Sequence, residues 1–124
     1  MGEKILSKGV VIINSNELEW ENDPRSYMKG VKRKVLWRDE NTGAGVELSK
    51  WSTDSWSESH SHLKSSEVIF FLAGEAEDQE GNLFSVEGVF SYMPKGSIHG
   101  SSSFNARAIT KEVISLHFYD GSNE

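Results

Sequence analysis

Three of the four histidines in the chain and one glutamate occur in two short segments whose spacing suits a metal centre. The first segment reads His60-Ser-His62-Leu-Lys-Ser-Ser-Glu67, and the second ends on His99. Two histidines at positions i and i+2 of a strand project from the same face, because strand side chains alternate. Imidazole and carboxylate together suit divalent ions such as Fe, Mn, Ni, Co, Cu or Zn. We therefore predict one divalent metal, held by His60, His62, Glu67 and His99.

Length and composition limit the class of protein. A chain of 124 residues fits one domain with one hydrophobic core. We expect a single domain over residues 1–124, with its core within about 31–119. The apolar and charged fractions, 36% and 26%, are typical of a soluble globular protein. No apolar run approaches the roughly 18 residues of a membrane span, and no signal-peptide pattern is present, so the expected location is the cytoplasm.

Cysteine content and charge exclude several functions. The chain has no cysteine, so disulfides, zinc ribbons, iron–sulfur clusters and thiol catalysis are excluded and any metal must be bound by nitrogen and oxygen. The formal net charge of −6 disfavours nonspecific binding to nucleic acid. A basic cluster is interpreted as a charged edge strand that resists aggregation, and consists of Lys29, Lys32, Arg33 and Lys34. We expect a small-molecule partner and neither nucleic acid nor membrane.

Short strand-like runs separated by Gly, Asn, Asp and Ser recur along the chain, which predicts an all-β sandwich or barrel. The strand that starts at Glu67 is apolar on both faces, so we expect both faces to be covered. In a chain this small, a partner subunit is one source of that cover, and we therefore expect a homodimer. The predicted strands are 10–13, 31–38, 45–51, 67–73, 83–86, 89–93, 98–104 and 108–119.

The two histidine-containing segments resemble the two signature motifs of the cupin superfamily. The first motif, G-x5-H-x-H-x(3,4)-E-x6-G, is matched by His60, His62, Glu67 and Gly74, with Asp54 in place of the opening glycine. The second, G-x5-P-x-G-x2-H-x3-N, is matched by Gly88, Pro94, Gly96 and His99, with Ser103 in place of the asparagine. The two departures fall at turn or packing positions, so the metal-binding positions are all kept.

Two further stretches, residues 35–48 and 74–81, are similar to the ChrR-like branch of cupins. That branch includes acetylacetone-cleaving dioxygenases and the zinc-binding sensor domain of an anti-sigma factor. The resemblance implies a single jelly-roll barrel, a double-stranded β-helix, with one divalent metal. Iron or zinc is preferred over manganese or nickel.

Three functions are compatible with such a site, because the cupin barrel hosts many chemistries. The first is a non-haem Fe(II)-type dioxygenase that acts on a diketone or diol-like molecule, with Glu67 as a metal ligand or a catalytic proton relay. An apolar lining from Ile69 and Phe71 would suit an uncharged substrate. The second is a metal-dependent sensor without catalysis. The third is a metal-dependent isomerase or lyase, in which Glu67 or Tyr92 moves protons.

Other polar and aromatic residues near the motifs have simpler interpretations. His117 alternates with apolar neighbours and is interpreted as a hydrogen-bonded or exposed strand histidine outside the site. Trp51 and Trp56 flank the first motif, and core packing is expected for at least one of them. Ser101 and Ser103 share the strand parity of His99 and are candidates to line the cavity.

Overall fold

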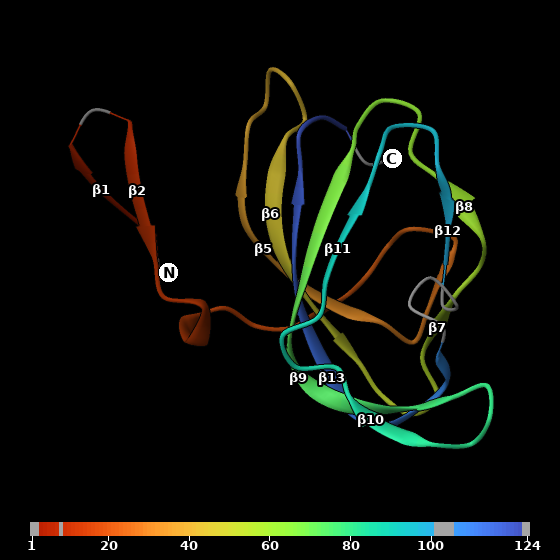
Figure 1. The fold of residues 1–124 in the computed structure, drawn as a ribbon. Helices are drawn as coiled ribbons and strands as arrows, with labels where there is room; N and C mark the ends of the chain where they lie inside the picture. The colour runs from red at the N-terminus through yellow and green to blue at the C-terminus, as the bar shows by residue number, and fades with distance from the viewer. Residues whose placement is uncertain (1–2, 8, 101–105, 123–124) are drawn as a thin grey trace.

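The computed structural model describes residues 3–7, 9–100 and 106–122 and is almost entirely β (Figure 1). One short 3-10 helix, η1, spans Ser15–Glu17 within the described residues. The strands in chain order are β1 (Glu3–Ser7), β2 (Val10–Ile13), β3 (Glu21–Asn22), β4 (Met28–Lys29), β5 (Lys32–Arg38), β6 (Gly45–Trp51), β7 (Trp56–Ser57), β8 (His60–Ser61), β9 (Glu67–Asp78), β10 (Leu83–Ser85), β11 (Phe90–Met93), β12 (Ile98–His99) and β13 (Ala106–Tyr119).

A large antiparallel sheet forms one wall of the fold. Its strands are ordered β10-β9-β13-β6-β5-β3, and β11 also pairs with β9. Two small sheets, β12–β8 and β4–β7, lie across from this wall (Figure 1). The arrangement is an antiparallel jelly roll, so the all-β prediction is confirmed. In the described residues the sheets are separate in their hydrogen bonding and do not close into one continuous barrel.

The two long strands β9 and β13 form the centre of the wall, and both run further than the sequence predicts. β9 continues through Gly74, which has φ +124° and lies so close to β13 that a Cβ there would be 2.7 Å from the carbonyl oxygen of Glu112. Glycine alone tolerates this conformation and this close approach. The sequence predicts that the strand ends before Gly74, but Gly74 is the position at which β9 passes close to β13. The predicted strand 98–104 is confirmed as β12 at its start, and residues 101–105 lie outside the described residues.

The hydrophobic core lies on the inner face of the wall. Alternation along β13 places Val113, Ser115, His117 and Tyr119 on this face, all of them buried. The inner face of the wall therefore holds apolar side chains at one end of β13 and polar side chains at the other. The buried apolar cluster consists of Phe71, Ala76, Val86, Ala106 and Val113, with Trp51, Ile69, Phe84, Val89 and Ile109 packed against it.

The outer face of the wall carries large apolar side chains that the described chain leaves exposed. Phe70 lies opposite Phe90, and Val68 lies between Phe118 and Tyr92. The described chain covers the inner face of strand β9, and cover of its outer face by a partner subunit stays a prediction. Tyr92 is 56% exposed on the outer face, so its predicted role in moving protons in the site is wrong.

The basic cluster is only partly an exposed edge. Arg33 and Lys34 are buried in strand β5. The Nε of Arg33 lies 2.9 Å from Glu21 Oε1, and the Nζ of Lys34 lies 4.6 Å from the centre of the Trp20 ring. The interpretation as solvated edge charges is wrong for these two residues, because the segment before β5 folds over them.

Within the described residues, no helix is long and apolar enough to cross a membrane. The compartment and the extent of the single domain, 1–124, stay predictions.

Candidate metal centre

Strands β8 and β12 bring the two motifs together. They pair antiparallel, and His99 lies directly opposite His60. The backbone N–H of Gly96 donates to the carbonyl oxygen of His62 over 2.9 Å, which ties the turn before β12 to the end of β8. Gly96 has φ +84°, a conformation that glycine adopts without strain. The predicted turn therefore holds His99 beside the histidine pair.

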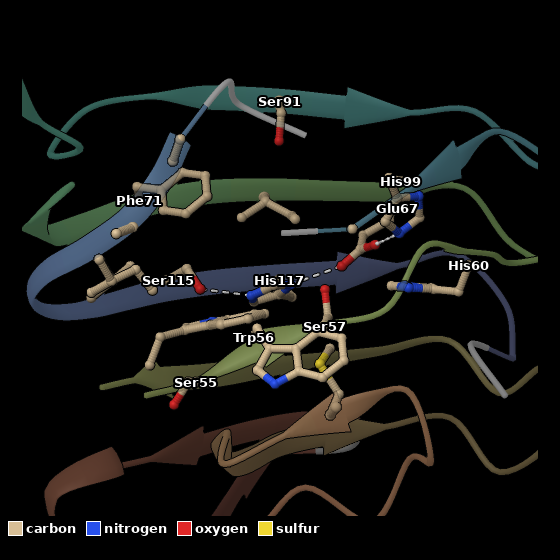
Figure 2. Close-up of a pocket in the computed structure, with 18 of the residues that line it drawn as sticks. Ser55, Trp56, Ser57, His60, Glu67, Phe71, Ser91, His99, Ser115 and His117 are labelled. Carbon is tan, nitrogen blue, oxygen red and sulfur yellow. Dashed lines mark hydrogen bonds and ion pairs between the residues drawn. The ribbon is translucent and has the colours of Figure 1, made fainter. Parts of the chain in front are cut away.

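The three histidine rings converge on one point. The ring centroid of His60 lies 4.4 Å from that of His99 and 5.0 Å from that of His62, and the centroids of His62 and His99 are 5.0 Å apart. Each ring offers one nitrogen, and these three atoms lie within 4.8 Å of one another. Figure 2 shows His60 and His99 on opposite sides of the Glu67 carboxylate, at one end of the cavity. A trio of imidazole nitrogens at this spacing fits a single divalent ion.

The hydrogen bonds of the rings also fit a metal. The Nδ1 of His60 lies 2.7 Å from the carbonyl oxygen of Glu58, and because a carbonyl only accepts, Nδ1 carries the proton and Nε2 is left for a ligand bond. Burial lowers the pKa of His60, partly opposed by that backbone hydrogen bond, which favours the neutral ring that a metal requires. Both ring nitrogens of His99 are buried; Nε2 faces Glu67 Oε1 over 3.2 Å, whereas Nδ1 has no hydrogen-bond partner in the described structure. Such groups are costly unless something satisfies them.

Glu67 lies at the edge of the histidine cluster. Its Oε1 is 3.2 Å from His99 Nε2 and 3.5 Å from His62 Nε2, although no oxygen of Glu67 joins the group of donors within 4.8 Å. Burial would raise the pKa of Glu67, but hydrogen bonds from His117, His62 and His99 outweigh burial and hold that pKa well below its usual value. The carboxylate is therefore ionised, with Oε1 facing His62 and His99.

His117 belongs to the site, and its assignment outside the site is wrong. The predicted hydrogen bonding of His117 is confirmed, since its Nδ1 lies 2.7 Å from Glu67 Oε2 and its Nε2 lies 2.7 Å from Ser115 Oγ (Figure 2). The ring is buried and lines the cavity. Strand alternation gave a signal for this role, because Ser115 and His117 share the face of Val113. The chain holds Glu67 in place through His117, as outer hydrogen bonds commonly hold metal ligands.

A cavity of about 290 Å³ opens beside the histidines. Its walls include Ile69 and Phe71, as predicted, together with Trp51 and Trp56. Trp51 also packs against the core, whereas Trp56 is half exposed at the rim. Ser101 and Ser103, expected to line the cavity, lie outside the described residues. The site therefore joins a polar, histidine-rich end to an apolar chamber.

Two tyrosines that the sequence did not single out pack against the histidines. The ring of Tyr27 stacks on His60, with 3.7 Å between centroids and 17° between planes. The ring of Tyr119 meets His62 edge-on at 5.6 Å. Tyr119 shares the strand parity of His117, which is a usable signal, but Tyr27 lies outside both motifs and gives none.

The fold and the three-histidine site together define a cupin with a candidate metal centre. The chain belongs to the ChrR cupin-like family, because the family model of the ChrR Cupin-like domain matches residues 8–118. A comparison with curated protein sequences gives no match.

Solved cupin structures share this fold at low identity. The predicted oxalate decarboxylase of Thermotoga maritima has a TM-score of 0.65 and 19% identity, covering 89% of this chain and 98% of its own. The polyketide cyclase RemF of Streptomyces resistomycificus has a TM-score of 0.62 and 16% identity over 87% of this chain and 77% of its own. The acetylacetone dioxygenase of Acinetobacter johnsonii has a TM-score of 0.60 and 16% identity over 93% of this chain and 76% of its own.

Proposed function

We propose that this chain is a metal-dependent cupin enzyme, a non-haem Fe(II)-type dioxygenase that acts on a small uncharged molecule such as a β-diketone or a diol. The observation that carries the proposal is a trio of histidine nitrogens within 4.8 Å of one another, at one end of an apolar cavity. Three protein ligands leave positions open on an octahedral ion. Fe(II) held by His60, His62 and His99 would supply redox chemistry with O2. Similarity to acetylacetone dioxygenases supports the choice of a diketone.

The cavity walls support an uncharged substrate. Ile69, Phe71 and Val113 offer apolar contact to such a substrate. Among the described lining residues, Arg107 is the one with a permanent cation, and its guanidinium pairs with Glu77. An anionic substrate would therefore find no unpaired arginine or lysine in the described wall.

Glu67 has two possible tasks in this proposal, as a fourth metal ligand or as a proton acceptor. Both tasks would use Oε1, because Oε2 accepts a hydrogen bond from His117. Glu67→Gln keeps the size of the side chain and removes its charge. Weaker metal binding by this variant would identify a ligand, whereas unchanged metal binding with lost turnover would identify a proton acceptor.

Oxygen uptake tests the dioxygenase directly. Protein loaded with Fe(II) under anaerobic conditions is expected to consume O2 when acetylacetone or catechol is added, and His62→Ala is expected to consume none because it lacks one ligand. An oxygen electrode measures both. Absence of uptake across diketones and diols would contradict the proposal. Saturable metal binding without any turnover would instead favour the sensor.

A second candidate is a metal-dependent isomerase or lyase, for which the hydrogen-bonded chain of Glu67, His117 and Ser115 is the specific observation. Such a chain can move a proton to and from a substrate held beside it. Turnover that proceeds equally well without O2 would favour this candidate over the dioxygenase.

We also propose that the chain forms a homodimer through the outer face of its large sheet. Phe70 and Phe118 are exposed there, and Phe90 of strand β11 is 61% exposed. A contiguous apolar face of this kind marks an interaction site in soluble proteins. Phe90→Lys is expected to shift the protein from dimer to monomer in light scattering after gel filtration. Val10→Lys, at an exposed position on β2 in a separate sheet, is the control, and a monomeric parent protein would contradict the proposal.

A further inference from the structure

A buried charged cluster lies next to the metal centre and outside both histidine motifs. Its centre is Arg25, which is 7% exposed. The guanidinium binds Asp23 with two contacts, Nε to Oδ1 at 2.8 Å and Nη2 to Oδ2 at 2.6 Å, and its Nη2 also binds Glu47. Both carboxylates are buried. A planar guanidinium held by two carboxylates has little rotational freedom, so Arg25 is a rigid anchor.

The anchor reaches two tyrosines. Nη1 of Arg25 donates to the hydroxyl oxygen of Tyr119 over 3.1 Å, and the guanidinium carbon lies 5.7 Å from the centre of that ring. Tyr27 lies two positions beyond Arg25, inside the turn that the N–H of Met28 closes on the carbonyl oxygen of Arg25.

The two tyrosines in turn contact two of the three histidines. Tyr27 stacks face to face on His60, and its ring centroid lies 6.0 Å from that of His62. Tyr119 meets His62 at an interplanar angle of 75°. Stacked and edge-on contacts limit the rotation of an imidazole ring and so fix the direction in which its nitrogen points.

The backbone around Arg25 is also held. Its N–H donates to Asp23 Oδ1 over 3.0 Å, and the N–H of Asp23 donates to the carbonyl oxygen of Val31 over 2.9 Å. The N–H of Met28 donates to the carbonyl oxygen of Arg25, closing a turn that contains Tyr27. These hydrogen bonds therefore fix both ends of the segment around Tyr27, and the ring of Tyr27 stacks on His60.

We propose that Arg25 is a positioning residue of the metal centre and acts through Tyr27 and Tyr119 to orient the rings of His60 and His62. This inference rests on the proposed metal-dependent function. Arg25 itself is not among the described residues that line the cavity, so its effect is on metal affinity and geometry and not on contact with the substrate.

Zinc affinity and the absorption spectrum of bound Co(II) test the proposal in the full chain. Tyr27→Leu removes the stacked ring and is expected to weaken Zn(II) binding by about 10–100-fold, the usual effect of losing an outer-shell partner, and to shift the Co(II) bands. Tyr27→Phe keeps the stacked ring and loses only the hydroxyl, so it is expected to weaken Zn(II) binding less than Tyr27→Leu does. Arg25→Lys keeps the charge but loses the planar fork, and is expected to weaken Zn(II) binding by a similar factor.

The outcomes separate this inference from the proposed function. Failure of the parent protein to bind Zn(II) or Co(II) would overturn the proposed function. Normal binding by the parent together with parent-like affinity and spectrum in Tyr27→Leu and Arg25→Lys would overturn only the positioning role. If Arg25→Lys does not fold, Tyr119→Phe replaces it, because this change breaks the contact with Arg25 and keeps the ring. Unchanged affinity and spectrum in Tyr119→Phe would then overturn the role of Arg25.

Discussion

His99→Ala is expected to lower the affinity for Zn(II) or Fe(II) by more than about 100-fold, beyond the range seen when only an outer-shell partner is lost. His99 supplies one of three nitrogens that lie within 4.8 Å of one another, so its loss removes one of the three imidazole ligands. The substitution also removes a buried Nδ1 that has no hydrogen-bond partner in the described structure, and alanine leaves no polar side-chain group buried at this position. The metal-free variant is therefore expected to fold, and competition with a chromophoric chelator measures the change in affinity.

His117→Ala is the matched control, since it removes the same side chain from a position beside the cluster. His117 contacts Glu67 and not the three-nitrogen group, so its loss is expected to weaken binding by about 10-fold, near the lower end of the outer-shell range. Equal affinities in the parent protein and His99→Ala would remove His99 from the metal centre.

Arg25→Met is expected to lower the free energy of unfolding by about 3–5 kcal/mol, the usual cost of removing one partner from a buried ion pair. The substitution leaves Asp23 and Glu47 buried without the guanidinium that binds both of them. Methionine fills part of the space but offers no hydrogen-bond donor, so Asp23 loses its ion pair and Glu47 keeps only the longer one, from Arg33 Nη1 at 3.7 Å. Urea unfolding of the metal-free protein measures the change without any contribution from metal binding.

An exposed ion pair provides the comparison for Arg25. The Nζ of Lys29 lies 3.8 Å from Glu58 Oε1, and both side chains are about half exposed. Lys29→Met is therefore expected to change the free energy of unfolding by less than about 1 kcal/mol. A loss as small as this in Arg25→Met would contradict the assignment of Arg25 as a buried anchor.

The strand pattern predicted the fold because burial in a jelly roll follows a period of two. β6 matches its predicted range, 45–51, and β9 and β13 contain theirs. The strand features that the sequence did not predict depend on contacts between distant segments of the chain. A sequence shows that Gly74 favours a turn, but only the packing of β9 against β13 explains why the strand continues through it. The two-residue strands β4 and β8 are likewise too short to carry a periodic signal.

The three histidines were predictable because two of them share a strand parity and the third follows a turn. His117 was wrongly placed outside the site, because strand alternation shows that it shares the face of Val113 but does not show which residue of the neighbouring strand it contacts. Its partner Glu67 lies 50 positions away in the chain. Tyr27 was not predictable at all, since its contact with His60 depends on how Arg25 and Asp23 fix the intervening backbone.

X-ray absorption at the metal edge tests the central claim, that His60, His62 and His99 hold one divalent ion. Protein loaded with one equivalent of Zn(II) is expected to show only nitrogen and oxygen neighbours at roughly 2.0–2.2 Å, with the outer-shell scattering of three imidazole rings. In His60→Ala the imidazole count is expected to fall by one. A parent spectrum without imidazole scattering, or one that His60→Ala leaves unchanged, would contradict the metal centre described here.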